Sequence, residues 1–269
     1  MPVHYKKDDE HIVLITIDRP EARNSFDIYM FRDLAKAWKD FNEDPDAWVA
    51  IITGVDRNFM SGADLKTFIP QVTKLQKQIA EGGVSEIDGC KLSDAVDAVL
   101  RKSKIYKPII AAINGPCVAG GMEMLGGVDI RIASEHASFG VMEPKQGLFA
   151  GGGTTVRLPR QLNFPAAMEF LLTAERFPAQ RALELGLINE IVPEGQLLEK
   201  AYEWARRITV NAPLAVQATK ESVLRGMQET MRDAYKIESE LSTRIFSSED
   251  AKEGPRAFAE KRKPRWSGK

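Results

Sequence analysis

The chain has 269 residues, of which 43% are hydrophobic and 28% charged, as expected for a globular enzyme with one α/β domain and an appendage or with two small domains. Its 37 Lys and Arg residues nearly balance its 38 Asp and Glu residues, so no overall field attracts nucleic acid or an anionic membrane. Two cysteines, three histidines without metal-ligand spacing and an acidic N-terminus without an apolar run predict a cytoplasmic protein with no bound metal, disulfide framework, signal peptide or membrane span.

Hydrophobic runs predict strands at 12–17, 48–52, 108–113 and 129–133. The run at 48–52 lacks polar alternation, which is typical of a strand buried on both faces of a helix-covered parallel sheet. Apolar residues at helical spacing predict helices at about 26–42 and 95–100, and the polar 66–91 segment is expected to be partly helical. This alternation of strands and helices indicates a stacked or parallel α/β core.

From about Phe164 onward the pattern is helical. We therefore expect an all-helical extension over the C-terminal third of the chain. Its predicted helices lie at 165–172, 179–185, 197–207 and 215–224. The domain prediction is a core over 1–195 that carries the active site and a helical C-terminal domain over 196–269.

Two predicted strands are each followed by a glycine-containing turn, at Gly62-Ala63 and at Gly120-Gly121. Glycine lets a ligand approach the backbone closely, and the first N–H groups of a helix have no partner within the helix. Two such turns that face each other could stabilise an oxygen as it acquires negative charge. Tight packing between strand and helix explains a single Gly-Gly pair more simply, so the glycines alone do not decide between the two readings.

Two glutamates in apolar stretches are candidate acid–base groups. Glu123 lies three residues after Gly120, on the first turn of a predicted helix, and Glu143 follows an apolar run. Burial raises the pKa of a carboxyl group towards the range that suits proton transfer, so the two side chains could converge on one pocket. A helix N-terminal carboxylate and a surface loop residue are the alternative roles, and the chemistry alone weighs them evenly.

The segments that contain the two glycine turns and the two glutamates resemble those of the enoyl-CoA hydratase/isomerase (crotonase) superfamily. The resemblance extends over nearly the whole chain, with its motifs in the family's order. It implies an α/β fold with a crotonase-like stacked ββα spiral core and a C-terminal helical extension. The matching segments are 52–65, 112–123, 129–133, 139–143, 182–192 and 249–258.

The resemblance implies an enoyl-CoA hydratase, which adds water reversibly to a 2-enoyl-CoA. The family's oxyanion hole falls on the backbone N–H groups of Ala63 and Gly120. Glu123 matches the glutamate that activates the water, and Glu143 matches the one that delivers or removes the α-proton. Coenzyme A is part of the substrate, so no separate cofactor is expected.

The resemblance also assigns residues that bind coenzyme A. Arg23 would pair with phosphate, and the backbone at 63–65 would recognise the adenine. An aromatic residue and a lysine of the C-terminal segment would reach coenzyme A, in some family members from a neighbouring subunit, although a solvated charge run explains the basic tail equally well. The set is Ala22, Arg23, Ala63, Asp64, Leu65, Phe258 and Lys261.

Departures from the family pattern leave the acyl group undetermined. The turn reads Asn24-Ser25-Phe26 where the family more often has Asn-Ala-Leu or Asn-Ala-Met, and Phe149-Ala150 replaces the usual proline region. An isomerase or a specialised dehydratase of the same fold, and a non-catalytic homologue that binds coenzyme A or RNA, are the alternatives. Family membership further implies a homotrimer or hexamer. Cys117 and His136 are not expected to be catalytic.

Overall fold

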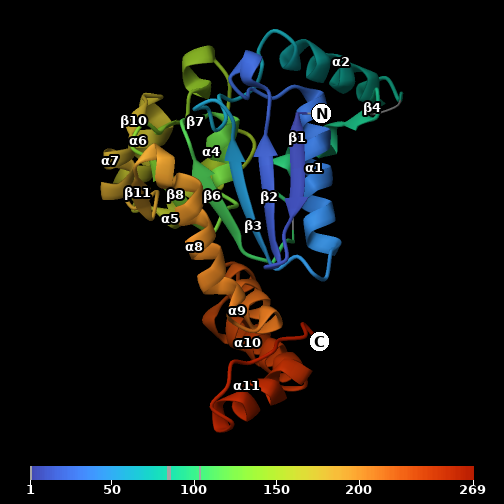
Figure 1. Cartoon of the computed structure of the whole chain (residues 1–269). Helices are drawn as coiled ribbons and strands as arrows, with labels where there is room; N and C mark the ends of the chain where they lie inside the picture. The colour runs from blue at the N-terminus through green and yellow to red at the C-terminus, as the bar shows by residue number, and fades with distance from the viewer. Residues whose placement is uncertain (1, 84–85, 103) are drawn as a thin grey trace.

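A computed structural model describes residues 2–83, 86–102 and 104–269. Its main sheet has six strands in the order β1-β2-β3-β6-β8-β11, and every neighbouring pair except β1 and β2 is parallel (Figure 1). In register, Ile52 of β3 lies between Ile15 of β2 and Ala111 of β6. The strands are β1 (Val3–Lys7), β2 (Ile12–Ile17), β3 (Val49–Gly54), β6 (Ile109–Ile113), β8 (Ile130–Ser134) and β11 (Glu190–Val192).

A second, smaller sheet has the order β10-β9-β7, with β7 and β9 parallel. Two isolated bridges, between Met60 and Cys117 and between Phe26 and Ala63, extend this layer towards the N-terminal part of the chain. The chain thus passes repeatedly from the main sheet into the second layer and then into a helix, which is the expected ββα spiral. The strands are β7 (Pro116–Val118), β9 (Ser138–Gly140) and β10 (Phe177–Pro178), and a separate hairpin joins β4 (Glu86–Ile87) to β5 (Cys90–Lys91).

Helices cover both faces of the main sheet. Ile52 and Ala111 belong to the large core that includes Trp38 of α1, while Ile51 and Ala112 pack with Ala201 of α8 on the opposite face. Burial on both faces explains why β3 and β6 contain uninterrupted apolar runs. The helices are α1 (Ile28–Glu43), α2 (Phe68–Ala80), α3 (Leu92–Ala98), α4 (Gly120–Leu125), α5 (Thr154–Gln161), α6 (Phe164–Thr173), α7 (Ala179–Glu184), α8 (Leu197–Thr209), α9 (Pro213–Gly226), α10 (Met231–Phe246) and α11 (Glu249–Ala259), with 3-10 turns η1 (Pro20–Ala22), η2 (Glu143–Gln146) and η3 (Glu194–Gln196).

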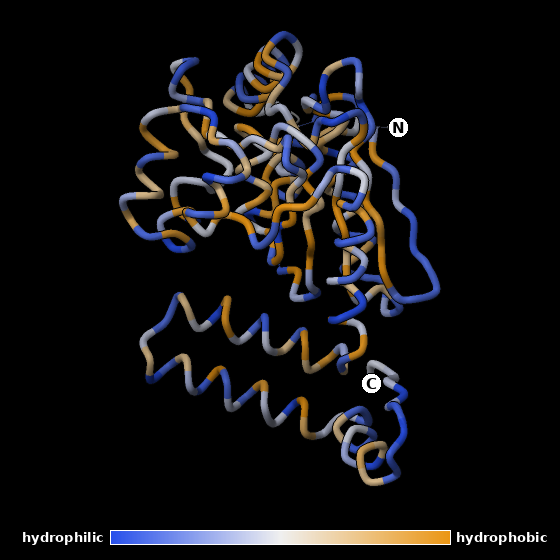
Figure 2. The backbone as a smooth tube through the Cα atoms, turned by 60° about the vertical axis from the view of Figure 1, so that its left-hand side comes forward, coloured by the Kyte–Doolittle hydropathy of each residue, from blue (hydrophilic) through white to orange (hydrophobic). Residues whose placement is uncertain are grey.

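The last three helices form an arm that projects away from the sheet (Figures 1 and 2). Lys220 of α9 anchors the arm, because its Nζ lies 2.7 Å from Asp129 Oδ2 and donates to the Lys107 carbonyl at 2.9 Å. None of the helices in the described part of the chain is both long and apolar enough to cross a membrane. Several large apolar side chains of the arm are exposed to solvent. They are Val223, Leu224, Met227, Met231, Tyr235, Phe246 and Phe258.

The structure corrects the predicted elements at the short strands. The four predicted strands agree within two residues at each end, but β1 was not predicted, since its polar side chains interrupt any apolar run. The prediction that everything after Phe164 is helical is wrong, because β10 and β11 lie there. Strands of two or three residues are too short to show a periodicity, and neighbouring strands define them. The domain boundary at 195 stays a prediction, and α8 on its C-terminal side packs against the sheet.

Candidate active site

The two glycine-containing turns of the sequence lie against each other. A Cβ added to Gly62 would lie 2.8 Å from Ala119 Cβ and 3.8 Å from the Gly120 nitrogen, and Gly62 has a φ of +90°. Phe26 holds the first turn from the other side, since its N–H donates to Gly62 O at 3.0 Å and its carbonyl accepts from Asp64 N–H at 2.9 Å. Only glycine combines this backbone conformation with this close approach.

Each turn presents an N–H group that the protein leaves free. The amides next to these groups do have partners. In the second turn Ala119 N–H donates to Gly140 O at 2.9 Å, and in the first turn Asp64 N–H donates to Phe26 O. No acceptor in residues 2–83, 86–102 or 104–269 bonds to the N–H of Ala63 or Gly120. Free donors on adjacent turns are what an oxyanion hole requires, and the assignment of this role to Ala63 and Gly120 stays a prediction.

The backbone at Ala119 is strained. This residue has φ 49° and ψ −117°, a region that favours glycine, and its carbonyl accepts from Glu123 N–H at 3.1 Å as α4 begins. Because ψ of Ala119 sets the plane of the next peptide bond, the strained conformation determines the direction of the Gly120 N–H. Strain of this kind persists only where the surrounding structure maintains it, and it is concentrated at functional sites.

An aromatic wall closes one side of the second turn. A Cβ added to Gly120 would lie 2.0 Å from Phe26 Cζ, so glycine is required at this position. The Phe26 ring is buried and lies 4.1 Å from the Phe31 ring and 5.9 Å from the Phe68 ring, centroid to centroid. The departure from the family pattern at residue 26 therefore lies directly beside one of the free N–H groups.

Glu123 is partly buried on the first turn of α4. Its carboxylate accepts a short hydrogen bond from Gly152 N–H, and a Cβ added to Gly152 would lie 2.2 Å from Glu123 Oε2. Desolvation raises the pKa of Glu123, while the Gly152 hydrogen bond and the positive charges of Arg101 and Arg157 lower it. Desolvation is the largest of these effects, so the pKa of Glu123 lies above its usual value.

Glu143 begins η2, and one of its carboxyl oxygens, Oε2, is buried without a hydrogen-bond partner. Desolvation raises the pKa of Glu143 to about 7, and the negative charge of Glu123 contributes to this rise. The structure therefore brings the two predicted glutamates into electrostatic contact although 20 residues separate them. An unpaired carboxyl group in an apolar setting is suited to donate or accept a proton near neutral pH.

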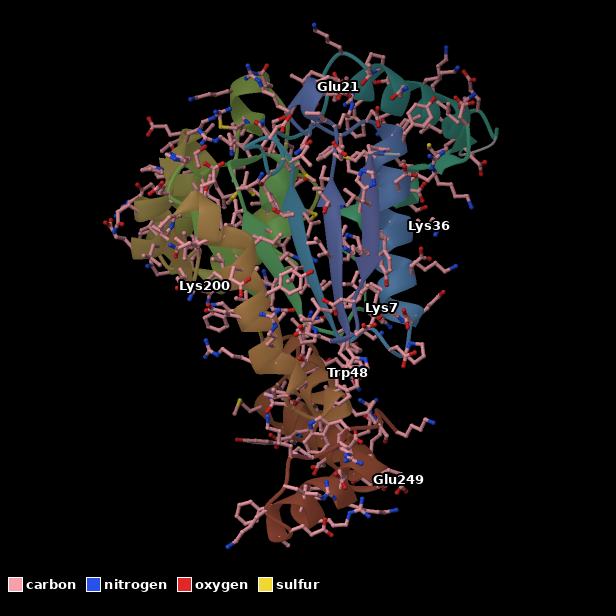
Figure 3. The ribbon with its side chains drawn as sticks, viewed as in Figure 1. Lys7, Glu21, Lys36, Trp48, Lys200 and Glu249 are labelled. Atoms are coloured by element: carbon pink, nitrogen blue, oxygen red, sulfur yellow. The ribbon has the colours of Figure 1, made fainter. Side chains whose placement is uncertain are left out.

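Two groups of predicted coenzyme A residues lie at opposite ends of the chain's fold. Arg23 is exposed, and Asp64 accepts from Arg19 Nη2 at 3.0 Å, which ties the 20–25 turn to the 62–66 turn. Figure 3 shows Glu21, next to Ala22, at the upper end of the sheet and Glu249, at the start of α11, at the opposite end. Phe258 and Lys261 belong to that distant arm, so a single chain does not bring them to the turns.

Sequence reasoning missed four residues of this site: Arg19, Arg101, Gly152 and Arg157. Arg19 lies two residues after the end of β2, which is a position that could have signalled it. The glycines at 151–153 carry no sequence pattern that identifies Gly152 as a source of an N–H group for Glu123. Their contacts with α4 depend on the folded chain and have no local signal.

Two other features of the molecule lie outside this cluster. A groove of about 430 Å³ lies between α1 and residues 89–97 and 104–105, and it is lined by mixed charges that include Arg32, Lys36 and Asp94. None of the site residues lines it. Among the described residues, no group of three or more His, Cys, Asp or Glu side chains could hold a metal ion.

Comparison with known proteins identifies the family to which this sequence is similar. Residues 7–269 match the family described as enoyl-CoA hydratase/isomerase. The chain is 42% identical over 263 residues to an enoyl-CoA hydratase of Mycobacterium tuberculosis, with 96% of this chain and 94% of that protein covered. It is 36% identical over 259 residues to the (E)-benzylidenesuccinyl-CoA hydratase of Thauera aromatica, with 96% of both covered. A solved enoyl-CoA hydratase of Bacillus anthracis, 31% identical, superposes with a TM-score of 0.89 over 100% of both chains.

The contact between Gly120 and Phe26 predicts a coupled pair of substitutions. Gly120→Ala should destabilise the protein by about 1–3 kcal/mol, because the added methyl group overlaps the end of the Phe26 ring. Phe26→Leu removes the ring end, so the double variant should regain part of this loss. Chemical denaturation of all four proteins measures the coupling. Gly195→Ala, whose methyl group meets open space, is the matched control. Additive effects of the two substitutions would contradict the contact.

Proposed function

The chain belongs to the enoyl-CoA hydratase/isomerase family, and from that membership we propose that it is an enoyl-CoA hydratase, a lyase that adds water reversibly to a 2-enoyl-CoA thioester. The observation that carries the proposal is the pairing of two free N–H groups, at Ala63 and Gly120, with two partly desolvated carboxyl groups. A non-catalytic protein that only binds acyl-CoA has no need of the second carboxyl group.

The reaction follows from the charges of this site. Glu123 removes a proton from water as the water oxygen bonds to the β-carbon, and the double-bond electrons move onto the thioester oxygen. The N–H groups of Ala63 and Gly120 stabilise this enolate oxygen. Glu143 then transfers its proton to the α-carbon, which gives the 3-hydroxyacyl-CoA. A proton passes from Glu123 to Glu143 to restore the starting state, so no net proton is consumed.

Coenzyme A binding is the next part of the proposal. The exposed Arg23 supplies a cation for phosphate, while Ala22 and the 63–65 backbone form the adenine side of the site. Phe258 and Lys261 would complete it from a neighbouring subunit, because the arm that carries them projects from its own core. The exposed apolar side chains of α9 and α10 support a homotrimer or hexamer, since such patches mark interaction surfaces.

The cellular setting is a further expectation. Both cysteines are free and buried thiols, which suits a reducing cytoplasm. Acyl-CoA chemistry would place the enzyme in fatty acid or lipid metabolism. Isomerisation and dehydration remain the rival activities of the same fold, and product mass separates them, because water addition changes the mass and isomerisation does not.

Replacement of either glutamate tests the two-acid mechanism. Glu123→Gln and Glu143→Gln should each lower the rate of hydration of a short 2-enoyl-CoA by about 10²–10⁴-fold, because an amide cannot exchange the proton. Loss of absorbance of the conjugated thioester follows the reaction, and circular dichroism checks folding. Glu135→Gln, at an exposed residue between β8 and β9, should leave the rate unchanged. Full activity in either site variant would exclude the mechanism.

The raised pKa of Glu143 predicts a pH profile. The active form of the pair carries one proton, so kcat/KM should fall as the pH rises through about 7, where Glu143 loses its proton. Because hydration and dehydration share this singly protonated form, both directions should show the same alkaline limb. Initial rates in both directions across the pH range test this. A rate that stays constant from about pH 6 to about pH 9 would contradict the assignment of the proton to Glu143.

The arm's role in coenzyme A binding predicts an effect on KM. Lys261→Ala should raise KM for an enoyl-CoA about 2–10-fold with little change in kcat, because it removes a contact that ground state and transition state share. Lys252→Ala, at an exposed residue of α11 in the same arm, is the matched control. Sedimentation of the native protein should show a trimer or hexamer. A fully active monomer would contradict the shared site.

A further inference from the structure

Arg157 of α5 is a partly buried cation whose partners are carbonyl groups. Its Nη1 donates to Val99 O at 3.2 Å and to Glu123 O at 3.4 Å, and its Nη2 makes a short hydrogen bond to Leu100 O. Across the described residues, Arg157 makes no ion pair with a carboxylate. A desolvated charge without a paired opposite charge is unfavourable, so a nearby counter-charge would stabilise it.

Three glycines make the space that the Arg157 side chain occupies. An added Cβ at Gly126 would lie 2.9 Å from Arg157 Cδ, and one at Gly127 would lie 3.2 Å from its Nη1. At Gly153 the distance to Cδ would be 3.6 Å. The guanidinium is therefore held in a closely fitted channel between the end of α4, the 99–101 segment and the start of α5. A shorter or neutral side chain would leave this channel poorly filled.

The charges that face the two catalytic glutamates are distributed unequally. Glu123 faces Arg157 from α5, Arg101 from the segment after α3 and the Gly152 N–H from the loop before α5. Glu143 faces the negative charge of Glu123 and backbone N–H groups of its own turn, with no cation among the groups that shift its proton affinity. Of the two carboxyl groups, Glu123 is thus the one in which negative charge is stabilised.

We propose that Arg157 is a positioning residue that holds Glu123 in place and favours its ionised form, so that the single proton of the pair resides on Glu143. The proposal rests on the proposed hydratase function and deepens it. The hydrogen bond to the Glu123 carbonyl fixes the backbone of the base, while the guanidinium supplies the counter-charge for its carboxylate. The two glutamates then start each hydration in different states, one ready to accept a proton and the other ready to donate.

Removal of the Arg157 charge should shift the pH profile of the reaction in one direction. An opposite charge nearby lowers the pKa of a carboxyl group, so its removal raises the pKa of Glu123. Activity is lost on the acidic side when both glutamates are protonated. The acidic limb of the kcat/KM profile should therefore move to higher pH by about one unit in Arg157→Gln. A residue that only fills space would lower activity evenly across the pH range.

The experiment compares pH profiles of hydration for the wild type, Arg157→Gln and Arg157→Lys. Lysine keeps the positive charge but cannot make all three hydrogen bonds to the carbonyl groups. Arg157→Lys should therefore restore the pH of the acidic limb, while its kcat stays below that of the wild type. Arg160→Gln is the matched control, because Arg160 is exposed on the same helix and donates to Val156 O. If Arg157→Gln does not fold, Arg101→Gln, which removes the other cation that lowers the pKa of Glu123, should shift the limb in the same direction.

The outcomes separate this proposal from the one it rests on. A wild type that hydrates no enoyl-CoA would overturn the proposed function and the role of Arg157 together. An active wild type with an unmoved acidic limb in Arg157→Gln would overturn the role of Arg157 alone. An equal shift in Arg160→Gln would do the same, since it would show a general charge effect. A shift in Arg157→Gln that lysine reverses would support the proposal.

Discussion

The contact between the Gly62 turn and the Ala119-Gly120 turn is the constraint on which the rest of the site depends. Free N–H groups are costly inside a protein, and here two of them lie on adjacent turns with no acceptor among the residues that the structure describes. The spiral makes this arrangement possible, because each passage from the main sheet into the second layer ends in a turn at the same edge. The strained Ala119 and the absence of side chains at Gly62 and Gly120 keep the turns close.

Desolvation of the two glutamates is the second constraint on the site. Both glutamates lose part of their hydration, which raises both pKa values, but their surroundings differ in the charges that remain. Two carboxyl groups of the same type can therefore perform opposite proton transfers, because the environment and not the residue type determines which one is charged. Gly152 contributes by approaching Glu123 more closely than any residue with a side chain could.

The position of the helical arm on the sheet separates two groups of predicted coenzyme A residues within one chain. Lys220, in the middle of α9, and Asp129 fix this helix at the end of the sheet remote from the turns, so the following helices extend away from them. The basic and aromatic residues at the end of the arm are thereby separated from the Arg23 side of their own chain. Self-association through the exposed apolar side chains of the arm would offer them a second site to contact.

The sequence by itself determined the buried strands, the two glycine turns, both glutamates and the family. These features are local: an uninterrupted apolar run predicts a strand, and motifs in a fixed order identify a fold. Only the tertiary structure decided the short strands of the second layer and the partners of the glutamates. Gly152 contacts Glu123 from 29 residues away and Arg157 contacts Leu100 from 57 residues away. Contacts of this kind depend on where the spiral places successive turns, and no local pattern of residues encodes that placement.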